Sequence, residues 1–301
     1  MTMLKPFFTF MSPAGPKGRL SVLIFHRVLP EPDPLFADEM HAQRFDEMCG
    51  WIKRWFNVLP LDQAVNHLKS GTLPARAACI TFDDGYADNF HVAMPILQRH
   101  ALTATFFIAT GFLDGGRMWN DTIIETVRSR EDLSIADRQA LIANHIKAIK
   151  YRSVADRVAE TEQIARYANA KLPTNLMMTS AEVKIMRKAG MQIGAHTVSH
   201  PILARLTDEQ VRQEIGNSKQ FLEDLLGERI GLFAYPNGRP GEDYSPQTVE
   251  VVRNLGFDAA VSTQWGASGM GNDMLQIKRF TPWDKSRLRF GIRLLANLRN
   301  S

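Results

Sequence analysis

The chain has 301 residues, of which 45% are hydrophobic and 23% are charged, and its formal net charge is +4. These are ordinary values for a globular protein, so the composition excludes a disordered chain and allows a sizeable core. The small positive charge and the lack of a recognition motif argue against nucleic-acid binding. No apolar run reaches the length of a membrane-spanning helix.

Seven short apolar segments, rich in β-branched and aromatic residues, predict β-strands. They cover residues 21–25, 78–82, 103–109, 191–195, 230–235, 257–262 and 275–280. Segments with helical spacing lie between most of them, at residues 45–56, 61–68, 86–100, 179–190, 207–227 and 247–255. Pro95 lies inside the third of these helices and is expected to end or kink it. Strands that alternate with helices predict a mostly parallel sheet.

The pattern changes between residues 115 and 175, where charged residues are frequent and apolar residues are fewer. Two Ser-x-x-Asp sequences in this stretch, beginning at Ser134 and Ser153, are typical of helix starts. We interpret the stretch as a helical insertion between two strands. At its entrance, Trp119-Asn120-Asp121 either faces a substrate or, through Trp119, fills the seam between the insertion and the sheet.

Two polar motifs follow strand-forming segments: Thr81-Phe82-Asp83-Asp84-Gly85-Tyr86 and His196-Thr197-Val198-Ser199-His200-Pro201. The C-terminal ends of such strands are where β/α proteins place their chemistry. Asp84, His196 and His200 would give a metal three protein ligands and leave a coordination position for water, as in catalytic zinc sites. Asp83 would then be free to accept a proton. The residues therefore predict metal-assisted hydrolysis.

The two motifs, in this order, resemble the first two motifs of the polysaccharide deacetylases, the NodB-homology group also called carbohydrate esterase family 4. The resemblance covers about residues 21–282 and is closest to the exopolysaccharide-deacetylase branch. It implies an α/β fold, a distorted (β/α) barrel of about seven strands, and a divalent metal that is usually zinc. It also implies removal of N-acetyl groups from an amino sugar in a polysaccharide, oligosaccharide or lipid-linked glycan.

We therefore expect residues 1–301 to form a single catalytic domain. Its parts are the barrel at about 21–282, the helical insertion at about 115–175, and a basic C-terminal helix at about 285–300.

The third motif of the family, usually Arg-x-Pro-Tyr-Gly, supplies a backbone N–H for the oxyanion. The matching stretch here is Ala234-Tyr235-Pro236-Asn237-Gly238. The resemblance assigns the N–H to Asn237 and places Tyr235 in the same oxyanion and substrate-binding group. Ala234 stands where the family has the arginine that orients the base. Arg279, on the last strand, is the nearest substitute by topology, and we place it in the same group.

The family's last-strand histidine is also absent, because the matching region reads Gln276-Ile277-Lys278-Arg279-Phe280. His26, at the end of the first strand, resembles an early histidine of the exopolysaccharide-deacetylase branch, which implies that it is the general acid. First and last strands are neighbours in a closed barrel, and an imidazole suits protonation of a leaving amine. The alternative is a core histidine that hydrogen-bonds to the backbone.

Two other functions stay open. The same site could hydrolyse a different non-peptide C–N bond, such as that of a small amide or cyclic ureide. The chain could also be a catalytically degenerate, carbohydrate-binding homologue, because the family arginine and the last-strand histidine are missing.

The C-terminal segment is basic and contains no acidic residue from Lys285 to Ser301. Its interleaved apolar residues predict an amphipathic helix, which either contacts an anionic membrane surface or covers the barrel. The first ten residues lack a full leader-like apolar region. We expect a cytoplasmic location, at the inner face of the membrane if the helix binds lipid, and an N-acetylated glycan as the partner.

Overall fold

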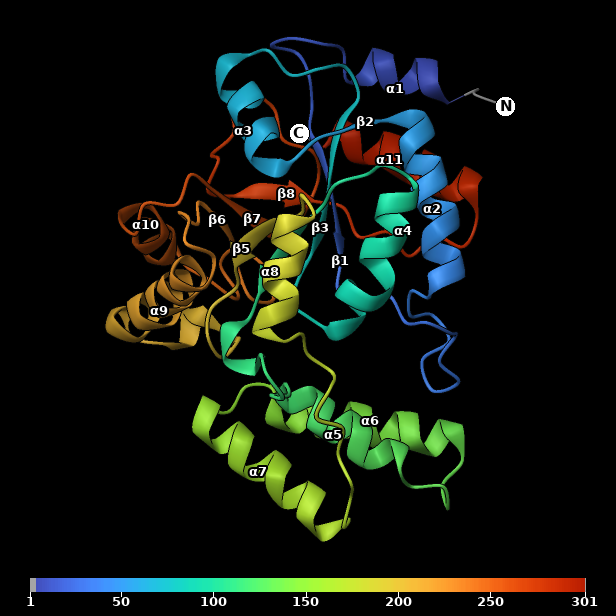
Figure 1. Cartoon of the computed structure of the whole chain (residues 1–301), viewed down its shortest axis with the longest axis vertical. Helices are drawn as coiled ribbons and strands as arrows, with labels where there is room; N and C mark the ends of the chain where they lie inside the picture. Colours follow the sequence, from blue (N-terminus) through green and yellow to red (C-terminus); the bar gives the residue numbers. More distant parts are fainter. Residues whose placement is uncertain (1–3, 301) are drawn as a thin grey trace.

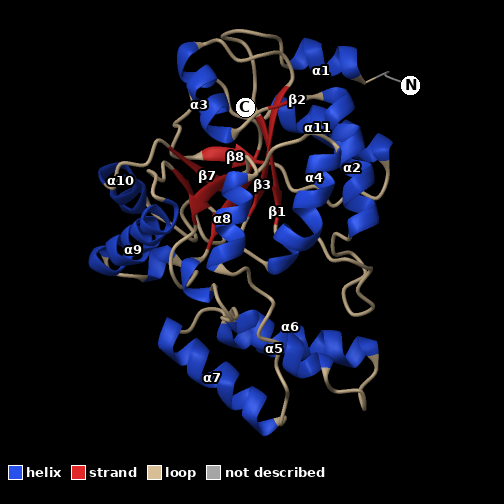
Figure 2. Cartoon of the chain, viewed as in Figure 1, coloured by secondary structure: helices blue, strands red, loops and turns tan. Residues whose placement is uncertain are grey.

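The structure is a computed structural model that describes residues 4–300 (Figure 1). Residues 1–3 and 301, which belong to the predicted domain, lie outside the described residues. Strands gather at the centre of the molecule, and helices surround them (Figure 2). The strands are β1 (Ser21–Phe25), β2 (Asn57–Val58), β3 (Ala77–Phe82), β4 (Thr105–Ile108), β5 (Gln192–Ala195), β6 (Leu232–Ala234), β7 (Ala259–Trp265) and β8 (Ile277–Arg279).

All neighbouring strands of the sheet run parallel, in the order β1-β3-β4-β5-β6-β7-β8, and the short β2 pairs beside β3. The first and last strands also meet. The N–H of Ile24 donates to the carbonyl of Phe280 at 3.0 Å, and the N–H of Phe280 donates to the carbonyl of Val22 at 2.8 Å. These bonds make a nearly closed barrel of seven strands, so the predicted (β/α) barrel is confirmed.

The helices outside the insertion lie around this barrel (Figure 1). They are α1 (Lys5–Met11), α2 (Ala42–Trp55), α3 (Leu61–Ser70), α4 (Met94–Arg99), α8 (Ser180–Lys188), α9 (Asp208–Leu226), α10 (Pro246–Asn254) and α11 (Arg287–Arg299). Local sequence explains several boundaries. Thr179 and Glu182 form a capping box at the start of α8, and Thr207 and Gln210 form one at the start of α9. Gly227 ends α9 with a left-handed backbone, φ 69°.

Three helices between β4 and α8 form a separate layer beyond the end of the barrel (Figure 1). They are α5 (Trp119–Arg128), α6 (Ile135–Ile149) and α7 (Val154–Tyr167). Ser134 and Ser153 cap α6 and α7 as predicted, each accepting a backbone N–H three residues later. The layer has a small apolar core of its own, to which Leu35 from the loop after β1 contributes.

The helix predicted at residues 86–100 is present, but its pattern is not uniform. A π-helical turn, Asn89–Ala93, is followed by the regular helix α4. Pro95 lies in the first turn of α4, directly after the π-helical turn. Residues 87–88 are also helical, so the helical segment runs from 87 to 99, and its regular α-helical pattern is interrupted directly before Pro95, in agreement with the predicted disturbance at this proline.

The main core lies between the sheet and its helices and is rich in aromatic side chains. Phe82 of β3 stacks on Phe106 of β4 with ring centroids 4.8 Å apart and on Phe25 of β1 at 5.3 Å. Each fully buried aromatic ring of this kind stabilises the fold by roughly 1.5–3 kcal/mol. This packing fixes the ends of β1 and β3, from which the polar motifs continue.

The C-terminal helix α11 buries Phe290, Leu294 and Leu298 against the core. The helix therefore covers the barrel, which is one of the two possibilities predicted from the sequence. On its outer face Leu288 and Ile292 remain 65% and 54% exposed. The predicted membrane contact stays a prediction. In the described residues, no helix is both long enough and apolar enough to span a bilayer.

Candidate active site

The two sequence motifs meet at the C-terminal end of the barrel. Asp83 and Asp84 follow β3 directly, and His196 follows β5, two strands away in the sheet. The N–H of Asp83 donates to the carbonyl of Phe25 at 2.9 Å, and the N–H of His196 donates to the carbonyl of Ile108 at 3.0 Å. Each motif is thus tied to the neighbouring strand at the point where its own strand ends.

Asp84, His196 and His200 converge on one point. The Oδ1 atom of Asp84 lies 3.4 Å from Nε2 of His196 and 3.5 Å from Nε2 of His200. A tetrahedral zinc ion with bonds of about 2.0–2.1 Å holds its ligand atoms roughly 3.3–3.4 Å apart. Oδ1 of Asp84 is also buried and has no hydrogen-bond partner among the described residues. A bound cation would satisfy this orphaned oxygen, so the three residues fit a metal ion.

The ring of His196 is oriented for coordination. Its Nδ1 lies 2.7 Å from the carbonyl oxygen of Ala234, to which only an N–H can donate. The neutral ring therefore carries its proton on Nδ1 and directs the lone pair of Nε2 toward Asp84. A hydrogen bond to the non-ligating nitrogen is the usual outer support of a metal-bound histidine.

A glutamate that the sequence analysis missed holds the loop that carries His200. Glu214, on α9, accepts the backbone N–H groups of Val198 and Ser199 at 3.0 and 2.9 Å. It also accepts the hydroxyl of Ser199 at 2.6 Å. No short motif identifies this residue, because it lies on another element and contributes through the fold.

The backbone at the site adopts an uncommon conformation. Asp84, Thr197, His200 and Asn237 all have positive φ, between 51° and 77°. Positive φ is unfavourable for residues other than glycine, and such residues concentrate at functional sites. Gly85, with φ 91°, continues the turn after Asp84, where glycine adopts this conformation without strain.

Burial and charge shift the pKa values of the three candidate ligands in different directions. Burial alone would lower the pKa of His196, but the carboxylates of Asp83 and Asp84 outweigh it and raise this pKa. Burial lowers the pKa of His200 to about 4, against the attraction of Asp84, so its ring is neutral near pH 7. Burial alone would raise the pKa of Asp84, but His196 and His200 hold it well below the usual carboxyl value. A neutral imidazole and an ionised carboxylate are the forms that bind metal ions.

The carboxylate of Asp83 is held by Arg279 in a two-pronged ion pair. The guanidinium nitrogens lie 2.7 and 2.8 Å from Oδ1 and Oδ2 of Asp83. Arg279 also donates from Nε to the carbonyl of Ser262 at 2.8 Å, and it is 1% exposed. Burial opposes the charge of Asp83, but the attraction of Arg279 outweighs it and lowers the pKa of that carboxyl. Asp83 is therefore ionised.

Arg279 thus lies against Asp83, where the family arginine was expected to act. Arg279 reaches it from β8 rather than from β6. Its complete burial separates it from any substrate, so the structure gives it no substrate contact.

Tyr235 and Asn237, the two site residues predicted in the turn after β6, have different surroundings. The backbone N–H of Asn237 has no hydrogen-bond partner among residues 4–300, so the role predicted for it in binding an oxyanion stays a prediction. Tyr235 is fully buried, and its hydroxyl donates to the carbonyl of Leu275 at 3.0 Å. Its ring stacks on Tyr244 with centroids 3.8 Å apart. The side chain of Tyr235 therefore supports the turn from the core and does not contribute the predicted substrate contact.

His26 follows β1 and is exposed, so it is not the core histidine of the alternative interpretation. It lines a cleft of about 440 Å³ together with Asp84, Tyr86 and Asp121. Its charge also contributes to lowering the pKa of Asp83 and Asp84. His26 therefore faces the same cleft as Asp84, from the end of the neighbouring strand β1.

Asp121, at the entrance of the insertion, joins a second polar cluster at this cleft that the sequence did not indicate. Arg27 pairs with Asp88 at 2.8 Å and stacks over the ring of Tyr86 at 4.6 Å. The hydroxyl of Tyr86 donates to Asp121 at 3.3 Å. Burial and, to a smaller extent, the charge of Asp84 raise the pKa of Asp121 to about 7, against the opposing effect of Arg27. Asp121 can therefore hold a proton near neutral pH.

The three residues at the entrance of the insertion have different surroundings. Asn120 and Asp121 line the cleft beside Asp84. Trp119 packs against the small core of the insertion, and the guanidinium of Arg157 lies over its ring at 5.4 Å. Trp119 therefore fills the seam, while its two neighbours face the space open to a substrate.

Comparisons with known proteins agree on one family. Residues 70–260 match the family model described as polysaccharide deacetylase. The Bacillus subtilis (strain 168) protein named "Putative polysaccharide deacetylase YxkH" is 22% identical over 264 residues, which is 87% of this chain and 71% of that protein.

Solved structures also resemble the fold. The deacetylase PplD of Streptococcus pyogenes, solved with acetate, has a TM-score of 0.65 at 20% identity and covers 93% of this chain and 98% of its own. IcaB of Ammonifex degensii has a TM-score of 0.64 at 19% identity, with 95% and 98% covered.

Proposed function

We propose that this chain, which belongs to the polysaccharide deacetylase family, is a metal-dependent hydrolase that removes N-acetyl groups from an amino sugar of a glycan. One observation carries the proposal, which is the convergence of Asp84, His196 and His200 beside an ionised aspartate. That aspartate, Asp83, forms an ion pair with Arg279. This arrangement combines a cation site with a separate proton acceptor at one end of a barrel.

The cation that best fits the site is zinc. Two imidazole nitrogens and one carboxylate oxygen form a frequent ligand set of catalytic zinc. When bound, such an ion acidifies a coordinated water and polarises the amide carbonyl. The orphaned oxygen of Asp84 and the lone pair of His196 support this assignment.

The remaining roles follow from the positions of this chain's own groups. Asp83 accepts a proton from the attacking water, and Arg279 fixes the direction of its carboxylate. The free N–H of Asn237 donates to the oxyanion of the tetrahedral intermediate. His26, exposed in the cleft, gives a proton to the leaving amine.

The shape of the cleft supports a sugar-containing substrate. Its volume of about 440 Å³ is within the range of small-molecule sites. Polar side chains that line it, such as Asn120, suit the hydroxyl groups of a sugar, and the exposed ring of Trp283 suits the apolar face of a sugar ring. The N-acetylated sugar would extend along this cleft, with its acetamido group at Asp84.

Acetate release from a panel of N-acetylated oligosaccharides tests the proposal. Zinc-loaded protein should release acetate from at least one of them and contain about one equivalent of metal. The double variant Asp84→Ala, His196→Ala should lose both. Metal occupancy that is unchanged in this variant would contradict the ligand set. Metal-containing protein that releases no acetate but cleaves a small amide or cyclic ureide would favour the other C–N hydrolase.

Replacing His26 by alanine should lower the rate on N-acetyl substrates by roughly 10²-fold, the scale of a positioned proton donor. Activated aryl esters need little protonation of the leaving group, so their hydrolysis should fall much less. Metal content and melting temperature should be unchanged, because His26 is exposed and is not a ligand. His91→Ala, at another exposed histidine, is the matched control. Equal losses on amide and ester would refute the assignment.

A further inference from the structure

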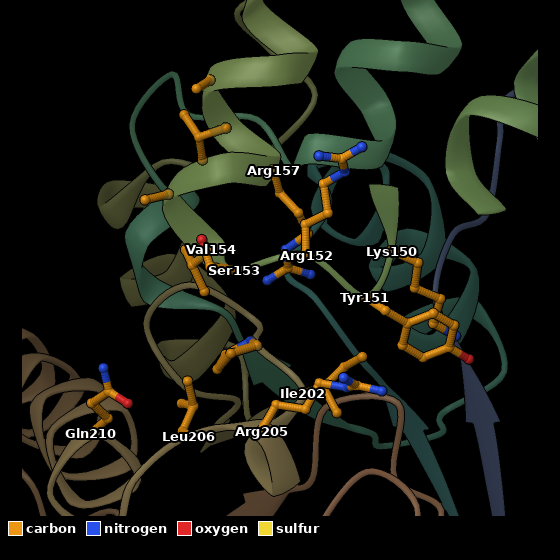
Figure 3. A pocket seen from close by; sticks show the side chains of 14 residues that line it. Lys150, Tyr151, Arg152, Ser153, Val154, Arg157, Ile202, Arg205, Leu206 and Gln210 are labelled. Carbon is orange, nitrogen blue, oxygen red and sulfur yellow. The ribbon is translucent and has the colours of Figure 1, made fainter. Parts of the chain in front are cut away.

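A second pocket lies where the insertion meets the barrel (Figure 3). It has a volume of about 940 Å³. One wall is the turn between α6 and α7 with the first turns of α7, and the other is the segment 201–206. Because Pro201 directly follows His200, this pocket begins one residue beyond a candidate metal ligand. A long substrate could therefore occupy both places.

The charged side chains that line the pocket are all basic: Lys150, Arg152, Arg157 and Arg205. Arg152 is neutralised by Glu160 at 2.9 Å. The other three form no ion pair with any residue between 4 and 300. Lys150 and Arg205 instead lie over the ring of Tyr151, at 5.7 and 5.0 Å. The pocket thus gathers three cations without an anion.

Arg157 is the most informative of the three. It is only 4% exposed, and its Nε atom is buried without a hydrogen-bond partner among the described residues. The face of its guanidinium lies over the ring of Trp119, but this contact gives Nε no acceptor, and burying an N–H of a charged group without an acceptor is unfavourable. Burial lowers the pKa of Arg157, and only the more distant Glu214 opposes this effect. Figure 3 shows its side chain extending from α7 toward the segment of Ile202 and Arg205.

The helix that carries Arg157 adds to the positive potential. α7 has 14 residues and begins at the pocket, with Ser153 as its N-cap. The N-terminus of such a helix carries a partial positive charge and favours anions. Asp156 offsets part of this charge, but its carboxylate accepts the hydroxyl of Ser153 at 2.7 Å and does not line the pocket.

We propose that this pocket binds a phosphate group of the glycan substrate, through Lys150, Arg157 and Arg205 at the N-terminus of α7. A phosphate carries up to two negative charges and three acceptor oxygens, which match three cations better than a single carboxylate does. The substrate assignment rests on the proposed function, whereas the presence of the anion site does not. The enzyme would then favour phosphate-bearing acetamido sugars over neutral ones.

Calorimetric titration of inorganic phosphate at fixed ionic strength tests the site on zinc-loaded protein. The double variant Lys150→Gln, Arg205→Gln should bind phosphate about tenfold more weakly or worse, because two charged partners are lost. Neither side chain is buried, so the fold should persist. Arg212→Gln, at an exposed arginine of α9 outside the pocket, should bind as the wild type does. The single variant Arg157→Gln, which removes the third cation, should also weaken the binding of phosphate.

Two results would overturn the phosphate site. Affinity that is unchanged in the double variant would mean that phosphate does not use the pocket. Binding that disappears in Asp84→Ala, but persists in the double variant, would place phosphate on the metal.

A kinetic comparison identifies the source of the phosphate. With an N-acetylglucosamine oligosaccharide that carries a terminal phosphate as substrate, the double variant should raise KM about tenfold with little change in kcat, and the same oligosaccharide without phosphate should be unaffected. Phosphate binding without this KM effect would overturn the substrate assignment. If no sugar releases acetate but phosphate binding follows Lys150 and Arg205, the proposed function fails and the anion site stands.

Discussion

Replacing Asp83 by asparagine should lower deacetylation by roughly 10²-fold or more, the scale on which a positioned proton acceptor contributes. The amide keeps the shape of the carboxylate but cannot accept the proton from water. Metal content should stay at the wild-type level, because Asp83 is not among the converging ligands. Turnover and elemental analysis on the same sample measure both effects.

Asp258→Asn is a suitable control, since it removes a carboxylate whose ion pair with Arg229 is on the surface. It should leave turnover unchanged. Near-wild-type turnover in metal-replete Asp83→Asn protein would remove Asp83 from the reaction. Loss of metal together with activity would instead give Asp83 a role in binding the ion.

Replacing Arg279 by glutamine should destabilise the protein by about 3–5 kcal/mol, the usual effect of removing one partner from a buried ion pair. The carboxylate of Asp83 would remain buried without its cation, and its pKa would rise. In the folded wild type, the pKa of Asp83 is lower than in the unfolded chain. The ion pair therefore stabilises the fold fully at pH values above the unfolded-state pKa, and this stabilisation is lost as the pH falls through the folded-state pKa. The difference between the proteins should therefore be largest near neutral pH and shrink in acid, as chemical denaturation would measure.

Arg229→Gln provides the matched control. Arg229 also forms a two-pronged pair with an aspartate, Asp258, but these side chains are 57% and 52% exposed. Loss of this exposed ion pair should change the free energy of unfolding by less than about 1 kcal/mol. Arg279→Lys keeps the positive charge but cannot form two parallel hydrogen bonds to Asp83. Compared with Arg279→Gln, it should therefore recover part of the stability and little of the activity. Equal small losses at positions 229 and 279 would contradict a structural role for the buried pair.

The strand ends could be located from the sequence because each has a strong local signal. The apolar runs before Asp83 and His196 end where the structure ends β3 and β5. Because the strands are parallel, their C-terminal ends lie at the same end of the barrel, which brings Asp84 and His196 to one region. The capping boxes at Thr179 and Thr207 were equally local, and both helices begin where predicted.

Contacts between distant segments could not be derived in this way. Tyr235 was assigned to the site because its turn carries Asn237, yet only the three-dimensional packing shows that its ring points into the core. Glu214 carries no motif, and its role comes from the loop of Val198 and Ser199 that it holds. Asp121 was indicated by its place at the entrance of the insertion, but its contact with Tyr86 was not. Arg279 was named by strand adjacency alone, and the fork that it makes with Asp83 is a property of side-chain packing.

The meeting of β1 and β8 affects how a newly made chain can become active. β1 is synthesised early, but its partner Phe280 follows only after almost all of the barrel has been translated. Contacts between such distant segments form late, because the loop between them must first be closed. Until then Asp83 has no ion pair with Arg279, and the cleft at His26 lacks the residues 281–283 that line it in the folded protein. A nascent chain whose last strand has not yet been made therefore has an incomplete site, and the proposed deacetylation can begin only after β8 has joined β1.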